Sequence, residues 1–292
     1  MIKYNPKVWV SLIFHSYSKQ VMRTLMPALL LTVLFSGLVA FVFHFFAIDN
    51  AQFPATIGMH SLLGIVLGLF LVFRTNSAYD RWWEGRKLWG SMVNSTRNLA
   101  IKLNAYVSAE ELELREWFSA SISNFVFASK EHLRRGVNMH ELTEMEEGFK
   151  ETLKKYSHKP NYLAGLLFKK VNALYKQGKL SGDQLLVLDK ELKDFMDIVG
   201  ACERIKYTPI PYSYSMYIKK FIFIYVITLP FAFVTTYSYF TLIIVAIITF
   251  VLLSIELIAE EIEDPFGKDV NDLPTDELAV KIKENVREIL LA

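Results

Sequence analysis

Three long stretches of this 292-residue sequence contain no Asp, Glu, Lys or Arg, and this feature constrains the fold more than any other. The stretches are residues 25–48, 51–73 and 221–255. A membrane-spanning helix needs about 20 consecutive apolar residues, so the first two stretches predict one span each, and the third, which is longer, predicts two. Hydrophobic residues make up 52% of the chain, in agreement with this class. We therefore predict an all-α, multi-pass membrane protein with four transmembrane helices in two hairpins.

Positive charges flank these spans on one side only. The turn between the first two spans carries Asp49 as its one charge, and the turn within residues 221–255 carries none. By the positive-inside rule, both termini and the middle of the chain are expected in the cytoplasm. The basic residues that support this orientation are Lys3, Lys7, Lys19, Arg23, Arg74, Arg81, Arg86, Lys87, Lys219 and Lys220.

The spans divide the chain into four segments. Residues 1–75 hold an N-terminal segment and the first transmembrane hairpin, and residues 76–217 form a cytoplasmic helical domain. Residues 218–258 form the second hairpin, and residues 259–292 form an acidic turn and a C-terminal cytoplasmic helix. This order places a soluble helical domain between two membrane hairpins.

Signals typical of helix N-termini predict helices in residues 76–217 and in the C-terminal tail. Ser108 with Glu111 and Ser181 with Gln184 have the spacing of a capping box, in which two side chains satisfy free amide groups at a helix N-terminus. Thr275 is the expected N-cap of the tail helix. This helix carries an apolar stripe that requires a partner, made of Leu278, Ile282, Val286, Ile289 and Leu290.

Several function classes find no support. The net charge is +2 and no basic block interleaved with aromatic residues occurs, so nucleic-acid binding is not expected. Cys202 is the single cysteine, which excludes an intrachain disulfide. No nucleophile elbow, HExxH motif or P-loop is found, so an enzyme is not predicted. The six histidines have no common metal-ligand spacing, and they are His15, His44, His60, His132, His140 and His158.

The second predicted span carries two features of interest. Gly64 and Gly68 form a GxxxG spacing, which lets neighbouring membrane helices pack closely. Ile65, Leu69 and Phe73 follow at i, i+4 and i+8 and therefore share one face. This stripe has two readings: contact with lipid or another helix, or a hydrophobic gate that forms where copies of the stripe meet around an axis.

An acidic turn follows the last span. Carboxylates of this density could hold Ca²⁺, which takes about 6–8 oxygen ligands, but clustered acids are more often a solvated helix end. The residues concerned are Glu260, Glu261, Glu263, Asp264, Asp269 and Asp272, with Pro265, Phe266 and Gly267 between them.

Three stretches together resemble the bestrophin family of ion channels in its short bacterial form. They are FRTNSAYDRWWEGRKLWG within residues 67–90, CERIKYTPIP at residues 202–211, and EEIEDPFGKDVNDLP at residues 260–274. The order of spans, middle domain and tail agrees with that family over nearly the whole chain. The resemblance implies a homopentamer in the bacterial inner membrane, with the pore on the fivefold axis.

The resemblance also implies roles for individual residues. The family's membrane constriction, or neck, consists of three apolar rings, which fall on Ile65, Leu69 and Phe73 here. Its lower cytosolic aperture is a single apolar side chain, placed at Leu185 or Leu186 by its spacing before Cys202.

Animal members of the family carry a calcium clasp in the turn after the last span. The corresponding groups here are the side chains of Asp269 and Asp272 and the carbonyl of Asp264. Three further positions of the turn that are mostly acidic in the animal proteins are occupied by Lys268, Val270 and Asn271. No cofactor is expected to be required, and Ca²⁺ is the one candidate ion.

We therefore predict a passive channel for chloride and other monovalent anions. A monovalent cation channel of the same fold is the alternative, because a ring of apolar side chains does not encode the sign of the permeant charge. An alternative of another class is a non-conducting membrane scaffold or sensor. The expected partners are four further copies of the chain, the lipid bilayer and the permeant ions.

Overall fold

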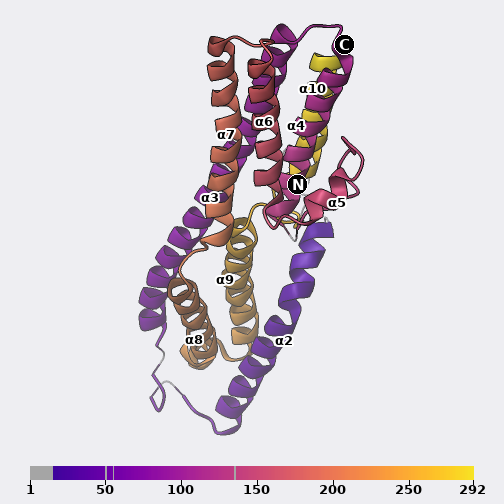
Figure 1. The fold of residues 1–292 in the computed structure, drawn as a ribbon. Helices are drawn as coiled ribbons and strands as arrows, with labels where there is room; N and C mark the ends of the chain where they lie inside the picture. Colours follow the sequence, from indigo (N-terminus) through magenta and orange to yellow (C-terminus); the bar gives the residue numbers. More distant parts are fainter. Residues whose placement is uncertain (1–15, 50, 55, 135) are drawn as a thin grey trace. The chain divides into compact units, whose positions relative to one another are not determined.

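The computed structural model describes residues 16–49, 51–54, 56–134 and 136–292, with side chains from residue 21 onward (Figure 1). The basic residues Lys3, Lys7 and Lys19, used above for orientation, lie outside the described side chains. All regular elements of the described residues are helices, with no strand among them, which confirms the all-α prediction for this part of the chain.

The chain divides into two compact units. The apolar unit contains the residues up to Arg81 together with Pro209–Glu263, and the polar unit contains Trp82–Thr208 together with Asp264–Ala292. These boundaries lie near the predicted segment edges at residues 75, 217 and 258. The first boundary falls inside one continuous helix, α3 (Ile57–Tyr106), which contains no proline that would interrupt it.

The apolar unit holds α2 (Ser16–Phe45), the first part of α3, α8 (Tyr212–Tyr237) and α9 (Thr241–Glu263). Three helical stretches are long and apolar enough to cross a membrane: Val21–Phe45, Ile57–Tyr106 and Tyr212–Glu263. The third consists of the two helices α8 and α9. In this unit α2 packs against both α8 and α9, and α8 packs against α9 (Figure 1).

The turn between α8 and α9 forms where the sequence predicts it. A short 3-10 helix, η2 (Ser238–Phe240), separates the two helices, and Ser238 has a positive φ of 49° that ends α8. Pro230 lies inside α8 without ending it. The predicted division of residues 221–255 into two helices is therefore confirmed.

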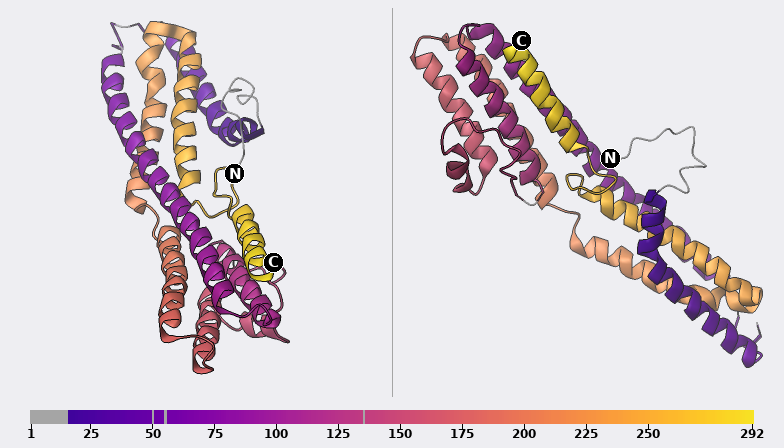
Figure 2. Two further views of the ribbon diagram at one scale, coloured as in Figure 1. Left: turned by 90° about the horizontal axis from the view of Figure 1, so that it is seen from above. Right: turned by 90° about the vertical axis from the view of Figure 1, so that its right-hand side faces the viewer.

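The polar unit is a helical assembly around one hydrophobic core. Its elements are the second part of α3, α4 (Leu112–His132), α5 (Phe149–Lys154), α6 (Lys159–Lys176), α7 (Gly182–Tyr207) and α10 (Thr275–Leu291). Buried aromatic side chains such as Phe118, Phe125 and Phe195 occupy the core. Helix α4 packs against α6 and α10, and α6 packs against α7 (Figure 2).

The tail helix α10 finds its partner in α4, as its apolar stripe predicts. Ile282, Val286 and Leu290 are buried, together with Ala279. The predicted N-cap is wrong by one position, because Pro274 precedes the helix and Thr275 is its first residue. The Thr275 hydroxyl instead accepts a hydrogen bond from Arg134 at 2.9 Å.

The two predicted capping boxes have different outcomes. At Ser181 the box is complete, since its hydroxyl accepts from the Gln184 amide and the Gln184 side chain accepts from the Ser181 amide. At Ser108 the prediction is wrong, because α4 starts only at Leu112. The Ser108 hydroxyl accepts from the Glu110 amide within the turn that follows α3.

Candidate functional site

One face of α3 in the apolar unit is uncovered. Ile65, Leu69 and Phe73 are 71%, 56% and 55% exposed, although all three side chains are large and apolar. The other side of the same helix turns is fully buried at Leu67 and Leu71. The predicted stripe is therefore a continuous apolar surface that a single chain leaves without cover.

Packing against α8 fixes which side of α3 is turned outward. Leu67 and Leu71 form one hydrophobic cluster with Ile218, Ile222 and Val226 of α8. Because the cluster holds one side of α3 inside the unit, residues on the opposite side, including the stripe, face outward.

The two glycines of the GxxxG spacing have different surroundings. A Cβ at Gly64 would lie 2.7 Å from the Tyr225 hydroxyl, whereas a Cβ at Gly68 would meet no atom within 4 Å. The Tyr225 hydroxyl donates to the carbonyl of His60 at 3.2 Å, and His60 Nε2 lies 3.1 Å from Thr228 Oγ1. Gly64 thus allows α8 to approach within the chain, and Gly68 stays open in a single chain.

A buried ion pair follows the stripe directly. Arg74 is 1% exposed, and its Nη2 lies 2.7 Å from Glu263 Oε2, with Glu256 Oε1 at 3.7 Å from Nε. Glu263 also accepts from the Ile210 amide at 2.8 Å through its side chain and from Arg81 Nε at 3.0 Å through its carbonyl. These contacts join α3, the end of α9 and the segment before α8 inside the apolar unit.

The turn after α9 also contacts α3 inside the polar unit. A Cβ at Gly85 would lie 3.2 Å from both the Phe266 ring and Pro265. Trp82 donates from its indole nitrogen to the carbonyl of Asn271 at 2.9 Å. The turn after α9 therefore packs directly on the start of the polar part of α3, and a side chain at position 85 would be tightly packed against it.

Two acidic side chains of this turn have protein partners close by. Asp264 pairs with Lys206, and Asp272 Oδ2 accepts from the Asp269 amide at 2.7 Å. A Cβ at Gly267 would lie 2.5 Å from Asp272 Oδ2, so a larger residue there would require the Asp272 side chain to move. Among the described residues, these aspartates do not form a group whose ligand atoms all lie within 4.8 Å of one another. The predicted calcium set combines two of these side chains with the carbonyl of Asp264, so grouping the carboxylates does not test it, and the calcium site stays a prediction.

The two candidates for the lower aperture differ in exposure. Leu186 in α7 is 71% exposed, whereas Leu185 packs against the core of the polar unit. An aperture needs a side chain that projects away from its own chain. The structure therefore makes Leu186 the better candidate of the two.

A charged network joins α10 to α4 in the polar unit. The buried Lys130 ammonium lies 2.7 Å from Asp276, 2.6 Å from Glu141 and 3.1 Å from Glu131. Arg134 Nη2 lies 2.9 Å from Asp276 Oδ2. The hydrogen bond from Arg134 holds the pKa of Asp276 well below its usual range, and it outweighs the opposing effect of burial.

The basic side chain Lys130 of this network has its pKa shifted in the opposite direction, upward. Burial lowers the pKa of Lys130, but hydrogen bonds to Asp276, Glu141 and Glu131 outweigh it, and the net pKa is raised. The network also reaches the turn after α9, because Arg134 Nε donates to the Phe266 carbonyl at 3.0 Å.

Outside this charged network, sequence reasoning also missed a cluster of metal-ligating side chains. The cluster consists of His132, His158 and Glu203 of the polar unit, and both histidines lie within hydrogen-bond distance of Glu203. They are far apart in the sequence, so no local spacing marks them. Nearby Cys202 is buried, and burial raises the pKa of its thiol to about 12.

Known proteins resemble this chain over most of its length. A voltage-dependent anion channel-forming protein from Nostoc sp. is 40% identical over 233 residues, which cover 77% of this chain and 75% of the relative. The voltage-dependent anion channel-forming protein YneE of Escherichia coli K12 is 31% identical over 278 residues, which cover 94% of this chain and 89% of the relative.

Solved structures give the same result. A crystal structure of a bacterial bestrophin homolog from Klebsiella pneumoniae matches with a TM-score of 0.83 at 28% identity, covering 92% of this chain and 99% of that chain. A second structure of that homolog matches with a TM-score of 0.84 at 29% identity, covering 92% and 99%. Residues 1–288 match the family described as Bacterial/Fungal Bestrophin protein. The chain therefore belongs to the bacterial and fungal bestrophin family.

Proposed function

We propose that this protein is a homopentameric ion channel that passes chloride and other monovalent anions across the bacterial inner membrane. Membership of the bestrophin family supports a channel, and the names of the relatives, voltage-dependent anion channel-forming proteins, support anions as the permeant ions. Transport through such a channel is passive, so no catalytic step and no cofactor are part of the proposal.

The observation that carries the proposal is the uncovered stripe on α3. Exposing large apolar side chains to water costs free energy, so lipid or another subunit is expected to cover them. Ile65, Leu69 and Phe73 are each more than half exposed in the single chain. Five copies of this face around an axis would form three stacked apolar rings, which gate ions by dewetting.

The proposed membrane arrangement uses four spans per subunit. They are α2, the first part of α3, α8 and α9, with both termini and the polar unit in the cytoplasm. The lengths and composition of the three apolar stretches support these spans, since Tyr212–Glu263 contains two helices. The lower aperture is assigned to Leu186, because it projects from α7.

The deciding experiment is a reversal-potential measurement on the purified protein in planar bilayers under a KCl gradient. A reversal potential near the chloride equilibrium potential supports the anion channel, and one near the potassium equilibrium potential shows a cation channel of the same fold. A reconstituted pentamer that carries no current would favour the scaffold reading. Repeating the measurement with Ca²⁺ and with a chelator tests whether the acidic turn affects gating.

A further inference from the structure

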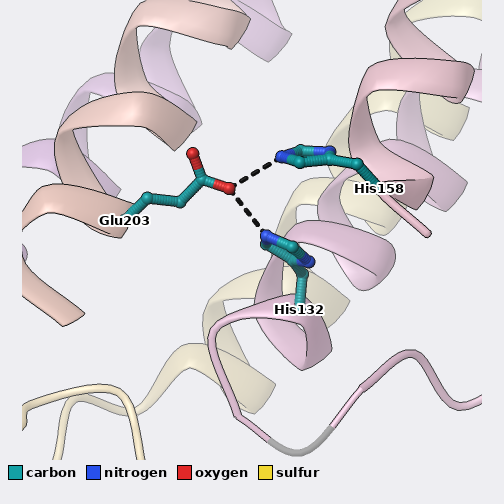
Figure 3. Close-up of side chains that lie close together, drawn as sticks. All are labelled: His132, His158 and Glu203. Atoms are coloured by element: carbon teal, nitrogen blue, oxygen red, sulfur yellow. Dashed lines mark hydrogen bonds and ion pairs between the residues drawn. The ribbon is translucent and has the colours of Figure 1, made fainter. Parts of the chain in front are cut away.

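Two histidines of the polar unit share one carboxylate oxygen. His132 lies in the last turn of α4, His158 is the N-cap of α6, and Glu203 lies in α7 (Figure 3). Glu203 Oε1 is 2.6 Å from His132 Nε2 and 2.7 Å from His158 Nε2. The two imidazole rings lie with their centroids 4.4 Å apart. Three separate helices thus bring two nitrogen ligands and one oxygen ligand to a single point.

The three ligand atoms are close enough for one ion and accessible to it. All of them lie within 4.8 Å of one another, and the three residues are partly buried. Partial burial orients the side chains while leaving a path for an ion and for water. Water can therefore complete the coordination, as it does in zinc sites with three protein ligands.

The charges around Glu203 favour a cation at this point. Within the described part of the chain, the ion pairs of Glu203 involve only these two histidines. Neither imidazole carries a permanent positive charge, so the carboxylate has no fixed countercharge of its own. A divalent ion would supply that charge and would bind both imidazole nitrogens at the same time.

We propose that His132, His158 and Glu203 form a binding site for Zn²⁺ or a similar divalent transition-metal ion. Imidazole nitrogen combined with a single carboxylate suits zinc, cobalt or nickel, whereas calcium and magnesium require shells made mostly of oxygen. The site is distinct from the acidic turn after α9, and it does not depend on the proposed channel activity.

Binding requires only small movements of the side chains. With metal–ligand bonds of about 2.0–2.1 Å in tetrahedral geometry, ligand atoms lie roughly 3.3 Å apart. The present separations of 2.6 and 2.7 Å are those of a hydrogen-bonded triad, so the side chains must open slightly around the ion. As the metal binds, each imidazole gives up the proton on Nε2, and a neutral ring takes a proton at Nδ1 by exchange with solvent.

One hydrogen bond of the metal-free protein is lost when the metal binds. His158 Nδ1 accepts from the Asn161 amide at 3.1 Å and so caps α6. When Nε2 of a neutral imidazole binds a metal, Nδ1 carries the proton and can no longer accept. Metal binding therefore exchanges this cap for three coordination bonds that hold α4, α6 and α7 together.

The test uses the full-length protein in detergent, treated with a chelator and then dialysed. Binding of Zn²⁺ is measured by competition with a chromogenic chelator for the wild type, His132→Ala, Glu203→Gln and the control His140→Ala. His140 is exposed and lies outside the cluster. The wild type and the control are expected to bind one Zn²⁺ per chain, and each ligand variant is expected to bind at least about tenfold more weakly.

A spectroscopic measurement on the wild type makes the test independent of variant folding. X-ray absorption of the zinc-loaded protein is expected to show two imidazole ligands and oxygen in the first shell. Binding that is equal in His132→Ala and the wild type, absence of stoichiometric binding in the wild type, or a first shell without imidazole would each overturn the proposal.

Discussion

The guanidinium of Arg74 lies 2.7 Å from the carboxylate of Glu263 inside the apolar unit, with the Arg74 side chain 1% exposed. Arg74 follows Phe73 directly, so the last residue of the exposed stripe is next in sequence to a charged side chain that is almost completely buried. The ion pair holds α3 against the end of α9. Rotation of α3 that would turn the stripe inward would break this pair.

Loss of the Arg74 charge is therefore expected to destabilise the protein strongly. Arg74→Met leaves the buried Glu256 and the partly buried Glu263 without their cation, and breaking a buried pair in this way costs about 3–5 kcal/mol. The measurement is thermal unfolding of the purified protein in detergent. Arg97→Met, at an exposed position of the same helix, is the control and should change the unfolding temperature little. Equal melting of both variants would show that the pair does not hold the helix.

Enlarging Gly85 is expected to displace the turn after α9. In Gly85→Val the new side chain would crowd the Phe266 ring and Pro265, and overpacking costs about 1–3 kcal/mol. Gly200→Val is the matched control, because a Cβ there meets no atom within 4 Å. Thermal unfolding should show a loss for the first variant only. A Gly85→Val protein as stable as the wild type would mean that the turn has room to move.

Shortening the neck side chains is expected to increase leak current. Leu69→Ala and Phe73→Ala remove apolar atoms from the proposed rings, which favours water and ions in the constriction. Leu31→Ala is the control, since Leu31 is also a large exposed apolar side chain, at 70%, but lies on α2. Single-channel recordings in planar bilayers measure the effect. Unchanged conductance in both neck variants would remove these residues from the gate.

The network around Asp276 is expected to make stability depend on pH at both extremes. The folded-state pKa of Asp276 is lowered, so its contribution is present above the unfolded value of about 3.9 and is lost as pH falls toward the folded pKa. The pKa of Lys130 is raised, so its contribution is complete below about 10.4 and is lost as pH rises through the folded pKa.

The variant Asp276→Asn tests how much of the stability loss at low pH is due to this one carboxylate. The variant should melt below the wild type at pH 7, and the difference should shrink as the pH falls below about 4. Asp197→Asn, which removes the exposed pair with Lys193, should show a small effect at every pH. A difference between Asp276→Asn and the wild type that stays constant with pH would contradict the role assigned to this carboxylate.

Helix formation and helix faces were the most predictable parts of this protein. Charge-free stretches predict the apolar helices because lipid excludes charges, and the spacing of Ile65, Leu69 and Phe73 predicts a common face because the helical repeat is local. The capping box at Ser181 was predicted for the same reason. At Ser108 the same pattern gives a wrong prediction, because the Ser108 hydroxyl accepts from the Glu110 amide within the turn and α4 begins only at Leu112.

Local pattern alone determined the class of the protein, its apolar helices and the apolar stripe of α3. The tertiary structure decided which side of α3 is buried, since that depends on the packing of Leu67 and Leu71 against α8. It also decided that His132, His158 and Glu203 meet, and that Asp264 of the acidic turn pairs with Lys206. Contacts between residues far apart in the chain depend on how helices pack, and the spacing of residues within one helix carries no information about them.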